Sequence, residues 1–266
     1  MIAQQRFDFD LPIWRVMADT FAETATRQLL AIELRSQTKV EWCVVDTQTS
    51  QKLWQHHLPN ASWWTSLIGF YAGTLLFHTY TSQEQPMPKE LLAVDAFSGT
   101  INWSLKDCKF ESTDGKIVRI LRTDRPLLQQ FNFCLLQNGQ ATSADIFSEI
   151  AIPADWRCPI LHQTSSPYFA TLSQFIEEKT GKMPQKAIKY GEITNHILFF
   201  QYLYPTNANT LSHFILVVNS SKIVLWHELI DSNINTELFA GCLYNDRCIV
   251  YLNHLSELVV LNLSLP

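Results

Sequence analysis

Short apolar runs that end in polar turns recur along this chain. In residues 91–103, LLAVDAFSGTINW, an apolar run leads to Asp95, and a turn-forming segment then leads to a second run that carries Trp103. An Asp side chain accepts hydrogen bonds from turn amides, and Gly99 supplies the positive φ that a tight hairpin needs. The pattern therefore predicts a strand, a tight turn and a second strand.

The same pattern occurs elsewhere in the chain. Residues 44–54, VVDTQTSQKLW, place Asp46 eight residues before Trp54, which is the spacing of the first segment. A looser copy, FILVVNSSKIVLW, ends at Trp226. Apolar segments ahead of the Trp103 and Trp226 copies supply two further strands each, which predicts four strands per repeat.

The two ends of the chain complement each other in this pattern. The last thirty residues, ELFAGCLYNDRCIVYLNHLSELVVLNLSLP, offer three strands and no tryptophan strand. Residues 11–16, LPIWRV, form a tryptophan strand around Trp14 with nothing before it. We therefore expect the N-terminal strand to complete the C-terminal blade and to close a ring, because closure removes open sheet edges.

Spacing sets the expected number of blades. Trp14 and Trp54 are 40 residues apart and Trp54 and Trp103 are 49 apart, and about 40–50 residues make one four-stranded blade. A further blade with a hairpin at Asn138 fits before Trp156. We predict one all-β domain over residues 1–266, a small β-propeller of five blades, with six as the alternative.

A helical insertion is expected around residues 165–184. Thr171 and Gln174 have the spacing of a capping box, Phe175 and Ile176 are apolar, and Gly181 is followed by Pro184 as a stop signal. Because this segment interrupts the repeat, it is a second candidate surface for binding.

The AVDAFSGTINW segment resembles the quinoprotein-type (PQQ-like) and WD-like repeats of β-propellers. Residues 91–103 match the PQQ-like pattern closely, whereas residues 44–54 have Ser50 at the glycine position. Overall the chain is similar to small propeller-like families of unknown function found in bacteria. In such a repeat Asp46 and Asp95 hold turns, and the large indoles fill the space between neighbouring blades. The tryptophans concerned are Trp14, Trp54, Trp103 and Trp226.

No cofactor is expected in spite of this resemblance. Quinone-dependent members of the family have larger propellers, a calcium site and often a disulfide between adjacent cysteines, and this chain has no Cys-Cys pair. The formal net charge of −5 and the pI near 5.9 argue against a nucleic-acid partner. No apolar run approaches the roughly 20 residues that span a bilayer, and no signal-peptide core is visible. We therefore expect a cytoplasmic protein without a membrane partner.

The candidate binding residues are His57, Trp63 and Trp64. His56 and His57 are adjacent on a strand pattern and point to opposite faces, so we expect no metal site there. Two consecutive tryptophans after a proline predict a contact surface, because indoles are favoured binding anchors. No catalytic residue is assigned. The sequence thus predicts a non-catalytic binding or scaffold module for a protein or small ligand, and the alternative is a carbohydrate-active, glycoside hydrolase-like propeller enzyme.

Overall fold

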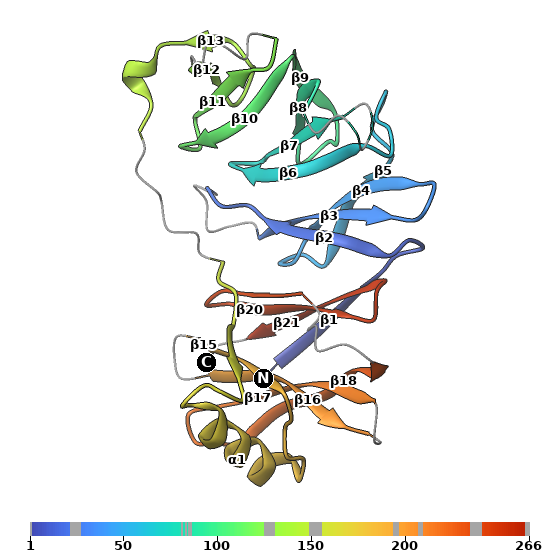
Figure 1. The fold of residues 1–266 in the computed structure, drawn as a ribbon, viewed down its shortest axis with the longest axis vertical. Helices are drawn as coiled ribbons and strands as arrows, with labels where there is room; N and C mark the ends of the chain where they lie inside the picture. Colours follow the sequence, from blue (N-terminus) through green and yellow to red (C-terminus); the bar gives the residue numbers. More distant parts are fainter. Residues whose placement is uncertain are drawn as a thin grey trace. The chain divides into compact units, whose positions relative to one another are not determined.

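The described residues of this all-β chain form five antiparallel sheets and one α-helix (Figure 1). The computed structural model describes residues 2–21, 28–80, 82, 84, 87–124, 131–148, 156–193, 197–206, 210–234 and 241–263. The chain divides into two compact units. The central unit is residues 11–154, and the terminal unit combines residues 1–10 with residues 155–266. The single domain over residues 1–266 stays a prediction.

The central unit contains three four-stranded sheets that follow one another along the sequence. The first consists of β2 (Ile13–Ala18), β3 (Leu29–Arg35), β4 (Val40–Asp46) and β5 (Gln51–His56). The second consists of β6 (Thr65–Tyr71), β7 (Thr74–Thr79), β8 (Glu90–Asp95) and β9 (Ile101–Lys106). The third consists of β10 (Cys108–Thr113), β11 (Ile117–Arg122), β12 (Phe131–Leu135) and β13 (Ala141–Thr142), with a short 3₁₀ turn at Ala144–Ile146.

Inner and outer strands of these sheets differ in burial. In β3 six of the seven residues are buried, whereas β5 has no fully buried residue. A strand covered on both faces needs apolar side chains at consecutive positions, which explains the uninterrupted apolar run LLAI at the start of β3. The outer strand β5 has at most one face against the core, and its sequence QKLWQH therefore combines polar and apolar residues.

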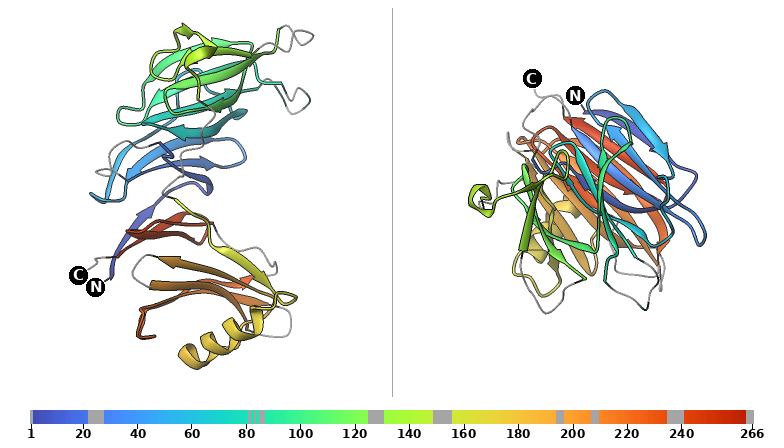
Figure 2. Two further views of the ribbon diagram at one scale, coloured as in Figure 1. Left: turned by 90° about the vertical axis from the view of Figure 1, so that its left-hand side faces the viewer. Right: turned by 90° about the horizontal axis from the view of Figure 1, so that it is seen from above.

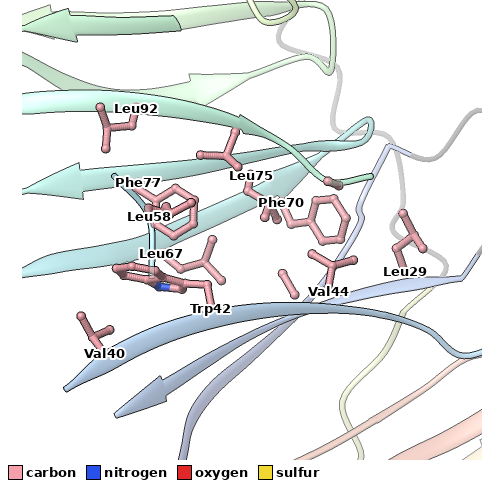
Figure 3. Close-up of a cluster of buried hydrophobic side chains, with 13 residues drawn as sticks. Leu29, Val40, Trp42, Val44, Leu58, Leu67, Phe70, Leu75, Phe77 and Leu92 are labelled. Atoms are coloured by element: carbon pink, nitrogen blue, oxygen red, sulfur yellow. The ribbon is translucent and has the colours of Figure 1, made fainter. Parts of the chain in front are cut away.

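A core cluster fills the space between the first two sheets (Figure 3). Trp42 of β4 is 1% exposed, and its ring meets the ring of Phe77 of β7 edge-on with centroids 5.2 Å apart. Leu58 and Leu67, both fully buried, lie beside Trp42 in the same cluster. Burying an aromatic ring of this size stabilises the fold by about 1.5–3 kcal/mol, so this cluster is a main link between the two sheets.

Two of the repeat tryptophans lie between neighbouring sheets. The indole N–H of Trp54 donates to the carbonyl of Ala96 at 2.8 Å, and that of Trp103 donates to the carbonyl of Leu136 at 2.8 Å. In each case the carbonyl belongs to the β-turn of the next sheet. Trp14 departs from this pattern, since its side chain is 66% exposed. The expectation that Trp14 packs between blades is therefore wrong.

The terminal unit contains the other two sheets. One consists of β14 (Ile160–Gln163), β15 (Ala187–Ile193), β16 (Ile197–Pro205), β17 (Leu211–Val218) and β18 (Val224–Ile234), so it has five strands. The other consists of β19 (Cys242–Tyr244), β20 (Cys248–Asn253), β21 (Glu257–Leu263) and β1 (Ile2–Asp8). Trp226 of β18 is half-buried against the core between these sheets.

An N-terminal strand does join the C-terminal sheet, but it is β1. It pairs with β21 in antiparallel register from Ile2 opposite Leu263 to Asp8 opposite Glu257. Figure 2 shows these two terminal segments side by side. The expected closing strand, residues 11–16, instead contributes to β2 and pairs with β3. A tryptophan strand does not by itself mark the closing strand, because Trp14 lies in the first sheet of the central unit. The closed ring stays a prediction.

The helix α1 (Phe169–Thr180) lies within the segment expected to be helical and covers one face of the five-stranded sheet (Figures 1 and 2). It ends at Gly181 in the left-handed conformation, as expected, with φ of 70°. Its start differs from the expectation. The N-cap is Tyr168, and Thr171 lies inside the first turn. Burial of Ile176 against the sheet holds the helix, so a capping box is not needed. Within the described residues, no helix has the length and apolarity needed to cross a membrane.

Candidate functional site

The three predicted binding residues lie together in the loop between β5 and β6. Residues 57–64 form this loop, and Leu58 anchors it because its side chain is fully buried. The loop is folded by its own hydrogen bonds. The amide of Ala61 donates to the carbonyl of Leu58 at 3.1 Å, and the amide of Ser62 donates to Oγ1 of Thr65 at 3.0 Å. The loop therefore presents its aromatic side chains from a held backbone.

Trp63 is an exposed large apolar residue of this loop, with 38% of its surface accessible. Its indole N–H donates to the carbonyl of Ser36 at 2.9 Å. The guanidinium of Arg35 lies over its ring, 5.0 Å from the centroid, which is within the range of a cation–π contact. Trp63 is thus exposed and, at the same time, fixed in orientation.

Arg35 ties the loop to the preceding sheet. Its Nη1 donates to the carbonyl of Trp63 and its Nη2 to the carbonyl of Thr65, both at 2.6 Å. Its Nε donates to the carboxylate of Glu33 at 2.7 Å. Arg35 thus makes four contacts: with two loop carbonyls, with Glu33 and with the ring of Trp63. Together they fix the position of the loop at the end of β3.

Glu33 is the anchor beneath Arg35. Its side chain is fully buried, and its Oε2 accepts hydrogen bonds from the indole of Trp42 at 3.3 Å and the amide of Leu67 at 2.6 Å. A buried carboxylate that loses its cation costs about 3–5 kcal/mol. The pair Glu33–Arg35 therefore supports the surface structurally. Substitution of either residue is expected to destabilise the first sheet as well as the loop.

Sequence reasoning missed this pair, although it carries a signal. LLAIELR places two opposite charges two residues apart at the end of an apolar strand. Side chains at i and i+2 share one face of a strand, so Glu33 and Arg35 had to lie side by side. Opposite charges on the face of an otherwise buried strand indicate a buried ion pair.

Trp64 and His57 complete the surface. Trp64 is half-buried and meets the ring of Trp63 edge-on, with centroids 5.0 Å apart. Both ring nitrogens of His57 face carbonyl oxygens, Nδ1 that of Val40 at 2.9 Å and Nε2 that of Ala61 at 3.1 Å. A carbonyl only accepts, so an imidazolium makes both hydrogen bonds and a neutral ring makes one. We call the four residues Arg35, His57, Trp63 and Trp64 the tryptophan surface.

Residues of the kind used in catalysis are engaged elsewhere. Oδ1 of Asp46 accepts from the amides of Gln48 and Thr49 in its turn. Burial raises the pKa of the Cys43 thiol to about 12, so this sulfur stays protonated at neutral pH. Among the described residues, no group of three or more His, Cys, Asp or Glu side chains is placed to hold a metal ion.

Comparison with known proteins gives one family and several distant folds. The profile of the family named Domain of unknown function (DUF4905) matches residues 24–103. No curated protein matches the chain.

Three solved structures match the chain at low sequence identity and low TM-score. A member of the DUF4221 family from Bacteroides vulgatus is 10% identical with a TM-score of 0.36, and the match covers 98% of this chain and 96% of that one. BamB from Moraxella catarrhalis is 10% identical with a TM-score of 0.33 and coverage of 99% and 100%. The Dos1 propeller is 10% identical with a TM-score of 0.30 and coverage of 94% and 55%. Scores of this size do not assign a shared topology.

Proposed function

We propose that the five sheets are blades of a small β-propeller and that the protein is a non-catalytic module that binds a protein partner through the tryptophan surface. The observation that carries this proposal is the fixed, exposed ring of Trp63. Interfaces are dominated by a few tryptophan, tyrosine and arginine residues that are ordered before binding. Trp63 is ordered in this way, because its indole N–H is hydrogen-bonded to Ser36 and one face of its ring contacts Arg35.

The charges around the surface favour an uncharged contact region on the partner. The guanidinium of Arg35 is neutralised by Glu33, and nearby Lys39 pairs with Glu41 at 2.6 Å. Among the described residues, these two ion pairs already use both cations and both carboxylates, so a charged group of the partner would lose hydration there without compensation. We therefore expect the partner to present apolar side chains to the indoles of Trp63 and Trp64.

The test begins with a photo-crosslinking amino acid at position 63 in the cells that make this protein. The same amino acid at position 14 is the matched control, because Trp14 is also exposed but lies outside the tryptophan surface. A protein that is captured at position 63 and not at position 14 is then purified, and its affinity for the chain is measured by calorimetry.

Trp63→Ala is expected to lower this affinity at least about tenfold, since truncation of an anchoring indole costs about 2 kcal/mol or more. Trp14→Ala is expected to leave the affinity unchanged. Equal capture at both positions, or full affinity of Trp63→Ala, would overturn the proposal. Thermal unfolding of Trp63→Ala close to that of the wild type shows that the loss is not due to unfolding.

A further inference from the structure

The central unit has a polar pocket at one end of its sheets. This is the end where the turns after Asp46 and Asp95 lie. The pocket is lined by the turn between β6 and β7, the turn after β8, and the turn after β12, and its volume is ≈ 480 Å³. Ligand pockets measure about 300–1,000 Å³, so the space suits a small molecule.

Strand β6 begins at the loop of the tryptophan surface and ends at this pocket, so the two sites lie at opposite ends of the strand.

The lining combines hydrogen-bond donors and acceptors with a single charge. Its side chains are the hydroxyl of Thr74, the carboxylate of Asp95, the ring of Phe97, and the carboxamides of Asn102, Gln137 and Asn138. A carboxamide both donates and accepts, whereas a carboxylate only accepts. No lysine, arginine or histidine is among the residues of the described chain that line the pocket.

One oxygen of Asp95 is available to a ligand. Its Oδ1 accepts from the amides of Phe97 at 3.0 Å and Ser98 at 2.7 Å, which holds the turn. Within the described part of the chain, nothing is hydrogen-bonded to its Oδ2. The turn opposite is fixed as well, because the amide of Gly73 donates to the carboxylate of Asp19 at 2.7 Å. The pocket walls are therefore set before a ligand arrives.

An aromatic face borders these polar groups. Phe97 is 47% exposed, and a Cβ added at Gly73 would lie 3.5 Å from its ring carbon Cε2, so the ring stands beside the turn between β6 and β7. An exposed ring next to amides and a carboxylate offers an apolar surface and hydrogen bonds on adjoining walls.

We propose that this pocket binds a neutral saccharide. Each sugar hydroxyl both donates and accepts, which matches carboxamides supplemented by one carboxylate, and the C–H face of the sugar ring matches Phe97. A phosphorylated or acidic sugar is disfavoured, because Asp95 would repel it and the lining residues that the structure describes include no cation. Glycoside hydrolysis needs two carboxyl groups flanking the bond, and Asp95 is the one carboxylate of the described lining, so the site binds without cleaving.

The neighbouring repeat provides a matched comparison. Asp46 holds the equivalent turn of the first sheet, but it is 2% exposed, and Gln48 stands where the second sheet has Phe97. The carboxylate of this turn is thus more deeply buried than the half-buried Asp95, and the turn has no aromatic ring at the position of Phe97. Gln48→Ala is therefore a control that alters the same turn position outside the pocket.

The test uses the full chain and saturation-transfer NMR with glucose, galactose, mannose and their disaccharides, followed by titration calorimetry. At least one neutral sugar is expected to bind, and its 6-phosphate to bind more weakly. Asn102→Ala and Gln137→Ala, both at exposed positions, are each expected to weaken binding about threefold to tenfold through the loss of a ligand hydrogen bond. Gln48→Ala and Trp63→Ala are expected to leave the affinity unchanged.

Several outcomes would overturn the proposal. These are the absence of binding by any neutral sugar, tighter binding of the sugar phosphate, or unchanged affinity of both pocket variants. Preference for a disaccharide over its monosaccharide indicates that the source is the end of a glycan chain, and equal affinity indicates a free monosaccharide. Because Trp63 takes no part, failure of this site leaves the protein-binding proposal untouched, and the reverse also holds.

Discussion

At Gly99 the backbone adopts φ of 70°, in the left-handed region, and the residue lies against aromatic rings of the preceding sheet. A Cβ at this position would lie 2.5 Å from Cε1 of His56 and 2.8 Å from Cδ2 of Trp54. Glycine is therefore favoured here for two reasons: the turn requires a positive φ, and the neighbouring rings leave no space for a Cβ. In the first sheet Ser50 occupies the equivalent position with φ of 62°, so that turn adopts the same conformation with a side chain.

Gly99→Ala is expected to destabilise the protein by about 2 kcal/mol or more, because backbone strain and a clash with Trp54 act together. Ser50→Gly is expected to change the free energy of unfolding by less than about 1 kcal/mol, since relief of the strained φ is offset by greater freedom of the unfolded chain. Urea unfolding of both variants measures the difference. Equal stability of Gly99→Ala and the wild type would contradict the packing role.

At the scale of elements, His78 links the second and third sheets. It lies in β7, and its Nε2 accepts a hydrogen bond from the amide of Phe110 in β10 at 2.9 Å, which requires a neutral ring at that nitrogen. Its Nδ1 lies 3.3 Å from the hydroxyl of Tyr80. Burial, with a smaller contribution from the charge of Lys109 and against the opposing effect of Glu111, lowers the pKa of His78 to about 4.

This shift predicts a loss of stability in acid. The pKa in the folded state lies below the value of about 6.5 for an exposed histidine, so the unfolded chain binds the proton more tightly. The stabilisation is complete above about pH 6.5 and is lost as the pH falls towards 4, with a total on the order of 3 kcal/mol. The protection of the Phe110 amide against hydrogen exchange, measured relative to a freely exposed amide at the same pH, is expected to fall over this range.

His78→Gln is the matched variant, because a carboxamide oxygen accepts from the Phe110 amide but does not titrate. Its exchange rate at Phe110, relative to that of a freely exposed amide, is expected to change less with pH than in the wild type. The same pH dependence in both proteins would show that His78 is not the titrating group.

At the scale of the whole chain, the two ends meet in one sheet. Strand β1 pairs with β21 over seven residues, and Arg6 of β1 forms ion pairs with Glu228 and Glu257 of the same unit. This pairing covers the edge of β21, which otherwise exposes a row of backbone donors and acceptors to other chains. The terminal unit is therefore complete only when the first residues of the chain are present.

Removal of residues 1–8 is expected to lower the melting temperature of the terminal unit and to promote aggregation. A synthetic peptide of residues 1–10 is expected to restore stability, because an extended peptide can add a strand to an open edge. The measurement is thermal unfolding together with light scattering. A peptide with Arg6→Ala is the control and should restore less. Full stability of the truncated chain would contradict the role of β1.

The order of apolar runs and turns determined much of this protein without help from tertiary structure. The turns at Asp46 and Asp95, the strands around them and the helix ending at Gly181 follow from local rules, since each depends on residues a few positions apart. The loop that carries Trp63 and Trp64 was recognisable for the same reason. Its two indoles are adjacent in the sequence and follow a proline.

Only the tertiary structure decided which strands meet and which side chains are left in solvent. It buried Glu33 beneath Arg35, exposed Trp14, and paired β1 instead of residues 11–16 with β21. It also brought three turns together around the pocket at Asp95. These outcomes depend on pairings between residues far apart in the chain. A local pattern cannot distinguish among them, because every tryptophan strand in the repeat looks alike until its neighbours are in place.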